Sequence, residues 1–314
     1  MNDIDMTGWP PLSGAAQRVI HEGAETFIEA ARAQGRDAAA IPDAVSRFGR
    51  AFSAYHGAAF SARVTRHAAA GGAVVWLIEP PVGCSLCLIE AGETVVMVDS
   101  GFQNYRAELL NVIRGIVPDL DARRKLMLLT HADVDHCGLA DLADEVWMSR
   151  KCFEAFRSEH AGGPNLRERD PVQGAYERMI KACSGYRTPP AELLHAIGGT
   201  LGRYAPPLTL IGTVTAGFLR FEAWEGRGGH VAGECVFVER AQKLVFTGDV
   251  FCNLKSFPPE QAAFNALAPV MMGTVDDDKD TANAERKAIF ELLGEGTWQV
   301  FGGHGGVKVW AAPQ

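Results

Sequence analysis

One short segment near the middle of the chain carries a high density of side chains that bind metals. Residues 130–138 read Thr-His-Ala-Asp-Val-Asp-His-Cys-Gly. They follow the apolar run KLMLLT at 125–130, which is typical of a buried strand. A loop of this kind, held at the end of a strand, limits the chain to folds in which that strand end can meet further ligands.

The four polar side chains of this loop can serve more than one ion. Alternate residues of an extended segment project to the same side, so His131, Asp133 and Asp135 can converge while His136 points to the other side. The simpler interpretation is an Asp-rich turn that caps a helix beginning near Gly138. Two histidines and two aspartates at this density favour a metal site over capping alone.

Three further ligand candidates lie at the ends of predicted strands. His230 lies in Gly-Gly-His-Val-Ala-Gly, Asp249 ends Phe-Thr-Gly-Asp, and His304 lies in Gly-Gly-His-Gly. Neighbouring glycines let the backbone approach a site closely. Each candidate is weak alone, because a histidine at a strand end is usually a surface residue. Their order along the chain is a strong signal.

The apolar patterns predict strands and helices in alternation. Short apolar runs bounded by Gly or Pro predict strands at 74–80, 84–92, 94–101, 125–130, 146–148, 208–215, 219–226, 234–241, 243–251 and 297–303. Helices are expected at 14–34, 42–54, 103–117, 138–145 and 280–293. Within a helical insertion at about 150–205, helices are expected over 151–160, 172–184 and 190–199. The predicted fold class is α/β, with two layers of sheet and helices outside.

The first part of the chain differs from the rest. Residues 1–60 are predicted to form a helical arm that packs on the protein or joins it into a homodimer, and 61–314 to form the α/β domain. The N-terminus has no apolar segment of a secretory signal, and the chain has no apolar run of about 18 residues, so no membrane association is expected. Seven irregularly spaced cysteines are typical of reduced thiols, which predicts a cytoplasmic location.

Charge argues against one class of partner. The net charge is −8, and the Lys and Arg residues are scattered along the chain rather than clustered. A nucleic-acid-binding protein needs a basic face to neutralise phosphates. We therefore expect no nucleic acid as partner, and a small molecule as substrate.

The ordered motifs resemble those of the metallo-β-lactamase superfamily, which are a His-x-His-x-Asp-His loop, then Gly-His, then Gly-Asp, then a late His. The segment Val-Asp-Ser-Gly at 98–101 resembles the early Asp-Ser/Thr-Gly strand end of this family. The resemblance covers about 75–310. It implies a four-layer αββα sandwich of the metallo-β-lactamase type, with metals at one edge between the sheets. Asp99 would then steady a ligand loop.

The resemblance also implies a dinuclear site, with two divalent ions sharing a water of lowered pKa. One ion would be held by His131, Asp133 and His230. The other would be held by Asp135, His136 and His304. Asp249 would bridge the two ions, and Asp135 would also orient the nucleophile. The expected activity is that of a dinuclear metallohydrolase, which uses a metal-bound hydroxide on a small-molecule ester, thioester, lactone, amide or phosphoester.

Asp133 departs from the family pattern, which usually has His at this place. A carboxylate lowers the positive charge of the site and favours iron or manganese over zinc, which is otherwise the expected metal. The flavodiiron proteins of the same superfamily carry a carboxylate here, so a di-iron oxidoreductase is the alternative function. Those enzymes also use a flavodoxin-like domain after the hydrolase fold, and we expect none in this chain. A third reading stays open, in which Asp133 binds only through a water and leaves one strong and one weak metal site. The insertion at 150–205 is expected to cover the active site.

Overall fold

Two seven-stranded sheets form the centre of the computed structural model, which describes residues 4–198 and 204–311. The first sheet has the order β1-β2-β3-β4-β5-β6-β7 and the second the order β14-β13-β12-β11-β10-β9-β8. The strands of the first sheet are β1 Arg63–Ala68, β2 Val74–Glu79, β3 Leu86–Ala91, β4 Thr94–Val98, β5 Arg124–Leu128, β6 Glu145–Met148 and β7 Leu194–Ala196. Those of the second are β8 Tyr204–Ala205, β9 Leu208–Ala216, β10 Leu219–Glu225, β11 Cys235–Glu239, β12 Leu244–Phe246, β13 Thr297–Phe301 and β14 Lys308–Ala311.

Side chains alternate along the central strands between an inner and an outer core. In β4, Val96 and Val98 pack between the sheets, whereas Val95 and Met97 pack on the outer side. In the second sheet, Phe237 packs inward. A strand buried on both faces requires cover on both faces. The result is the predicted order of helix, sheet, sheet and helix.

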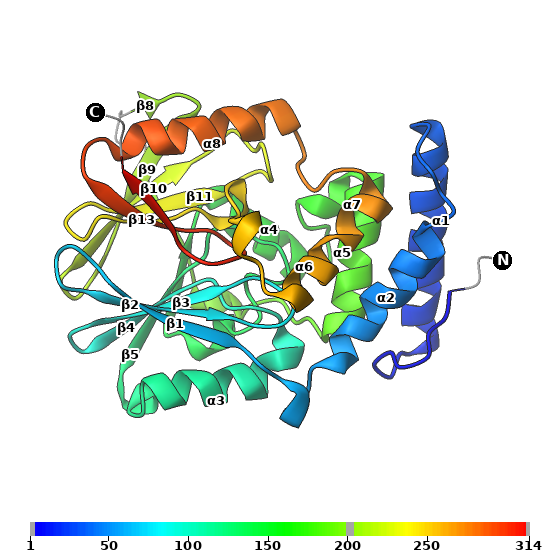
Figure 1. Ribbon diagram of the computed structural model, residues 1–314, viewed down its shortest axis with the longest axis horizontal. Coiled ribbons are helices and arrows are strands. Elements are labelled where there is room, and N and C mark those ends of the chain that lie inside the picture. The colour runs from blue at the N-terminus through cyan, green and yellow to red at the C-terminus, as the bar shows by residue number, and fades with distance from the viewer. Residues whose placement is uncertain (1–3, 199–203, 312–314) are drawn as a thin grey trace.

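The eight α-helices of the described chain cover the outer faces and one end of the sandwich. They are α1 Gly14–Ala33, α2 Ile41–Ala54, α3 Arg106–Ile116, α4 Arg150–His160, α5 Pro171–Ser184, α6 Pro259–Asn265, α7 Leu267–Met272 and α8 Lys279–Leu293. Figure 1 shows α3 along the outside of the first sheet and α8 along the outside of the second, while α1, α2, α5 and α7 gather at one end.

The N-terminal arm packs against the insertion. Helix α1 contacts α5 and α7, and α2 contacts α7 and α5. Phe48 of α2 stacks on Phe264 of α6 with ring centroids 5.2 Å apart. Apolar residues of the arm thus belong to the same buried cluster as the outer face of the first sheet. The arm therefore packs on the α/β domain within this chain, and the homodimer stays a prediction.

Two predicted helices are wrong. Residues 138–145 contain the 3-10 turn Ala140–Leu142 and the first residue of β6 in place of a helix, and the amide of Gly138 donates to the carbonyl of Gly101 (3.0 Å). A side chain at position 138 would collide with that neighbouring backbone. Residues 190–198 form the 3-10 turn Ala191–Leu193 and then β7, which pairs in parallel with β6 and places Leu194 in the core. Gly199, the last residue of that predicted helix, lies outside the described residues, as do the other insertion residues at 200–203.

Strands β1 and β14 and helices α6 and α7 were not predicted from the sequence. The two strands lie at sheet edges, and their residues are mostly exposed or half-buried, so they lack a continuous apolar run. Helices α6 and α7 are 7 and 6 residues long, too short to show a clear helical period.

Candidate metal centre

The loop after β5 brings four of the predicted ligands to the rim between the sheets. The amide of His136 donates to the carbonyl of Asp133 (3.0 Å), which turns the chain tightly. The thiol of Cys84 donates to the carbonyl of Asp135 (2.9 Å) and holds the loop to the segment before β3. His131 and His136 are fully buried, and their rings lie 3.9 Å apart between centroids.

The other three predicted ligands come from loops of the second sheet. His230 follows β10, Asp249 lies in the 3-10 turn Gly248–Val250 after β12, and His304 follows β13. The amide of Gly303 donates to the carbonyl of Gly248 (2.7 Å), which ties the last two loops together. A Cβ at position 303 would overlap the Asp249 carboxylate, so glycine is required there.

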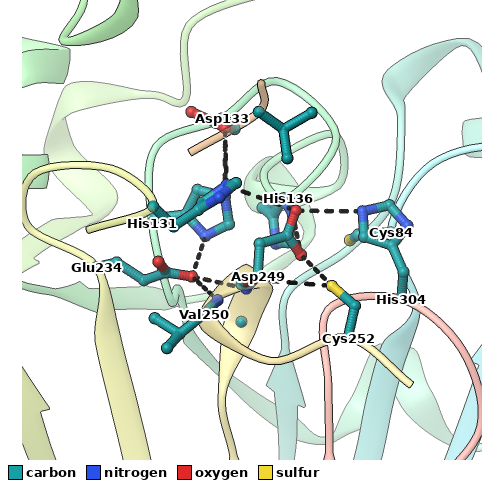
Figure 2. A network of polar contacts seen from close by, with 12 residues as sticks. Cys84, His131, Asp133, His136, Glu234, Asp249, Val250, Cys252 and His304 are labelled. Atoms are coloured by element: carbon teal, nitrogen blue, oxygen red, sulfur yellow. Dashed lines mark hydrogen bonds and ion pairs between the residues drawn. The ribbon is translucent and has the colours of Figure 1, made fainter. Parts of the chain in front are cut away.

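Asp135, His136 and His304 form one compact group of possible ligand atoms. The Nε2 atom of His304 lies 3.4 Å from Oδ2 of Asp135 and 3.4 Å from Oδ2 of Asp249. The Nε2 atom of His136 lies 3.5 Å from Oδ1 of Asp249. Figure 2 shows the Asp249 carboxylate among these imidazole rings.

His131, Asp133 and His230 form a second group. The Oδ2 atom of Asp133 lies 3.4 Å from Nε2 of His131 and 3.8 Å from Nε2 of His230. The Oδ2 atom of Asp249 is 3.7 Å from Nε2 of His230, so its carboxylate lies between the two groups. The structure therefore brings all seven predicted residues together.

The donor atoms of the site fit a bound cation. The buried Nε2 atoms of His131 and His136 have no hydrogen-bond partner within the parts of the chain that the structure describes. Buried polar atoms without a partner are costly, and a metal ion would use their lone pairs. Burial alone would raise the pKa of Asp249, but His304 and His136 hold the pKa of that carboxyl well below its usual range. It is thus ready to bind as an anion.

Asp99 orients His136, as predicted. Its Oδ2 atom accepts from Nδ1 of His136 (3.0 Å) and from the hydroxyl of Thr130 (2.8 Å), and Oδ1 accepts from the Thr130 amide (2.9 Å). The proton on Nδ1 leaves Nε2 of His136 free to face the other ligands. Asp99 has φ of 55°, in the left-handed region where Asn and Asp are enriched.

Two further carboxylates support the site, and the sequence analysis missed both. Oε1 of Glu234 accepts from the amides of Asp249 (2.6 Å) and Val250 (3.0 Å) and lies 3.5 Å from Nδ1 of His131. Burial, and then Asp249, raises the pKa of Glu234 well above its usual value. Asp276 accepts from Nδ1 of His230 (3.0 Å). Glu234 lies four residues after His230, but Asp276 has no local signal in the sequence.

A buried arginine at the centre is the main residue that the sequence analysis missed. Arg167 lies in the 3-10 turn Arg167–Arg169 of the insertion and is 6% exposed. Its Nη2 atom donates to Oδ2 of Asp133 (2.8 Å) and to Nε2 of His230 (2.8 Å). Burial alone would raise the pKa of Asp133, but Arg167 and His131 hold the pKa of this carboxyl well below its usual range.

A pocket opens above the ligands. It has a volume of about 80 Å³ and includes Asp133, Asp135, Asp249, His230 and His304 in its lining. The insertion contributes further lining residues, which are Arg167, Gln173, Tyr176, Glu177 and Ile180. The apolar lining outside the insertion is Phe102, Phe264, Ala268, Met272 and Val275. Described residues of the insertion therefore form part of the pocket wall.

The chain belongs to the metallo-β-lactamase superfamily, because the model of that family matches residues 80–304. This match covers most of the chain and includes all seven predicted ligands. The superfamily has a fold of the hydrolase type, and its members bind metal ions, usually zinc. A comparison with curated proteins gave no match.

Several solved structures are similar to this chain at low sequence identity. A metallo-β-lactamase family protein from Thermus thermophilus is 16% identical over 79% of this chain and 74% of that chain, with a TM-score of 0.49. An archaeal metallo-β-lactamase superfamily protein from Sulfolobus tokodaii is 17% identical over 73% and 79%, with a TM-score of 0.43. A flavoprotein from Thermotoga maritima is 12% identical over 79% and 58%, with a TM-score of 0.46.

Among the described residues, no helix combines the length and the apolar character needed to cross a membrane. All seven cysteines are free thiols.

Proposed function

We propose that the protein is a metal-dependent hydrolase of a small molecule, acting on an ester, thioester, lactone, amide or phosphoester bond. One observation carries the proposal, namely buried imidazole nitrogens without hydrogen-bond partners beside anionic carboxylates at the floor of a covered pocket. A bound divalent ion, zinc in the first instance, supplies a Lewis acid and a water of lowered pKa. The sequence predicted two such ions.

Asp135 and Asp249 are the proposed catalytic carboxylates. Both line the pocket, and both lie 3.4 Å from Nε2 of His304 through their Oδ2 atoms. Asp249 lies between the two ligand groups and fixes their separation. Asp135 accepts a hydrogen bond from the attacking water and orients it toward the substrate.

Tyr176 of α5 is placed to act on the leaving group. Its side chain lines the same pocket as Asp135 and contacts the ring of Phe48 with centroids 5.4 Å apart. Burial, followed by the charges of Asp135 and Asp133, raises the pKa of Tyr176 well above its usual value. The phenol is therefore proposed as a hydrogen-bond donor to the leaving oxygen, nitrogen or sulfur, since a raised pKa makes full transfer of its proton unfavourable.

The pocket favours a small substrate. Ligand pockets generally measure roughly 300–1,000 Å³, and this one holds about 80 Å³ under α5, α6 and α7. A small molecule is therefore the proposed substrate and partner. The free thiols are consistent with the proposed cytoplasmic location.

The alternative, a di-iron oxidoreductase, rested on the carboxylate at position 133. Asp133 pairs with Arg167 through both of its oxygens, with Nε 3.1 Å from each. This pairing gives the carboxylate a role that does not involve iron, and therefore the hydrolase is the better-supported function.

The test is a hydrolysis panel on protein purified without added metal. Metal content is measured first, and then activity on esters, thioesters, lactones, amides and phosphoesters before and after chelation. We expect at least one class to be cleaved, with activity lost on chelation and restored by metal. Asp249→Asn should lower activity by at least about 100-fold, since even a residue behind a ligand is worth 10–100-fold. The exposed Asp43→Asn is the matched control and should have no effect.

Failure of the proposal has two forms. If metal-loaded protein cleaves no member of the panel, the hydrolase assignment is wrong. If chelated protein and Asp249→Asn cleave as fast as the metal-loaded wild type, the metal has no part in the reaction.

A further inference from the structure

We infer that the guanidinium of Arg167 takes the place of one metal ion in the seven-residue site, so that the protein binds a single ion. The inference rests on the proposed function in that it assumes a metal-binding centre. It departs from the predicted dinuclear arrangement in which His131, Asp133 and His230 hold an ion of their own.

All five N–H groups of the Arg167 guanidinium donate hydrogen bonds. Nε donates to Asp133, and Nη2 donates to Asp133 and to His230. Nη1 donates to the carbonyl of Val275 (3.0 Å) and to Oδ1 of Asp277 (2.9 Å). A guanidinium has five N–H groups and no acceptor. No donor is left to bind an anionic substrate, although the side chain borders the pocket.

The one free lone pair of the His230 ring faces Arg167. Its Nδ1–H donates to Asp276, whose carboxylate also accepts from the guanidinium of Arg286 (2.9 and 3.0 Å). This leaves one lone pair, on Nε2. Since Arg167 can only donate, the contact of 2.8 Å places that lone pair in a hydrogen bond with Nη2. A lone pair in this bond cannot also bind a metal.

Asp133 forms an ion pair with Arg167. Its carboxylate receives the fork of Arg167 through both oxygens, with Arg167 buried and Asp133 half-buried. A planar guanidinium matches the geometry of a carboxylate, which can accept two parallel N–H bonds. A neutral imidazole offers only one acceptor. The Asp at position 133, where the family usually has His, therefore complements Arg167.

Charge supports the same conclusion. A dication between Asp133 and His230 would lie beside the guanidinium in a buried environment, where like charges repel strongly. Five residues keep ligand atoms that Arg167 does not engage, and these are His131, Asp135, His136, Asp249 and His304. The unpartnered Nε2 atoms of the described chain belong to this set, on His131 and His136.

The experiment measures bound metal per chain by mass spectrometry, after equilibration with excess zinc and removal of free metal. Wild type should bind one ion. Arg167→Met removes the guanidinium but keeps an apolar stem of similar length, and it should bind two ions. Arg169→Met changes the exposed arginine two residues further along the same turn, and it should bind one. Far-ultraviolet circular dichroism checks that each variant is folded.

A second variant keeps the test decisive if Arg167→Met fails to fold. His230→Gln should leave the single ion in place, with an affinity within about threefold of wild type, because His230 is not a ligand in this account. Two ions in the wild type, one ion in folded Arg167→Met, or a loss of the ion in His230→Gln would each overturn the inference while leaving a metal-dependent hydrolase intact. No metal in any variant would overturn the proposed function itself, and the inference with it.

Discussion

Asp99 determines which nitrogen of His136 is free to bind a metal, and Asp99→Asn tests this directly. Asparagine tolerates the left-handed backbone that residue 99 adopts (φ 55°), so the change alters the acceptors without straining the chain. Whichever way the amide is turned, its NH2 group faces a donor. That donor is either the Thr130 amide or the Nδ1–H of His136.

The magnitude follows from the hydrogen bond that the substitution removes. A hydrogen bond to a charged group contributes about 1.5–3 kcal/mol. Without the bond between His136 Nδ1 and Asp99, which is 3.0 Å long, the tautomer with its proton on Nε2 is also favoured, and that tautomer cannot bind a metal. At about 1.4 kcal/mol for each tenfold change, metal affinity should fall by roughly 10–100-fold, which is the usual range for a residue behind a ligand.

The assay is competition for zinc against a chromophoric chelator, with folding checked by circular dichroism. Asp43→Asn is the control, since its side chain is 68% exposed and pairs only with Arg47 of the same helix. An affinity of folded Asp99→Asn within about twofold of wild type would refute the orienting role of Asp99.

Three further predictions follow from the site. Removal of metal by a chelator should lower the melting temperature and readdition should restore it, because an ion at 100 times its Kd stabilises the native state by about 2.7 kcal/mol; an unchanged melting curve would contradict a native-state site. Tyr176→Phe should lower kcat by about 100-fold or more with unchanged metal content, and unchanged kcat would exclude the phenol as a hydrogen-bond donor to the leaving group. The pKa of Asp133 is depressed in the folded protein, so Asp133 contributes stability that is fully present above its unfolded pKa of about 3.9 and is lost as the pH falls through the folded pKa. The free energy of unfolding of metal-free protein, measured with urea, should therefore decrease below about pH 4. The decrease with pH should be less steep in Asp133→Asn, and an equal decrease in both proteins would show that Asp133 is not the group responsible.

The candidate ligands could be recognised in the sequence because each one follows a strand. His131, Asp249 and His304 directly follow apolar runs, and strands of both sheets end at the same rim. Periodic helices such as α1 and α8 were also found within a residue or two. The close approach of two backbone segments could not be predicted from the sequence. Gly138 is predicted to start a helix, but in the structure its backbone contacts the loop of Gly101.

Residues that act through long-range contacts left no local signal. Arg167 is 34 residues from Asp133 and 63 from His230, and it lies in a polar stretch that resembles a solvated surface. Asp276 is 46 residues from the histidine that it orients. The Asp at position 133 was the one visible clue. In the sequence alone, this Asp favours iron or manganese over zinc. In the structure, Asp133 instead pairs with the buried guanidinium of Arg167, which is distant in the sequence.

The most direct test of the metal centre is a crystal structure of the metal-loaded protein, with anomalous scattering measured at the absorption edge of the bound metal. We predict a single anomalous peak among the five residues that Arg167 does not engage, which are His131, Asp135, His136, Asp249 and His304, with Arg167 still in contact with His230. A peak between Asp133 and His230, alone or as a second site, would contradict the account.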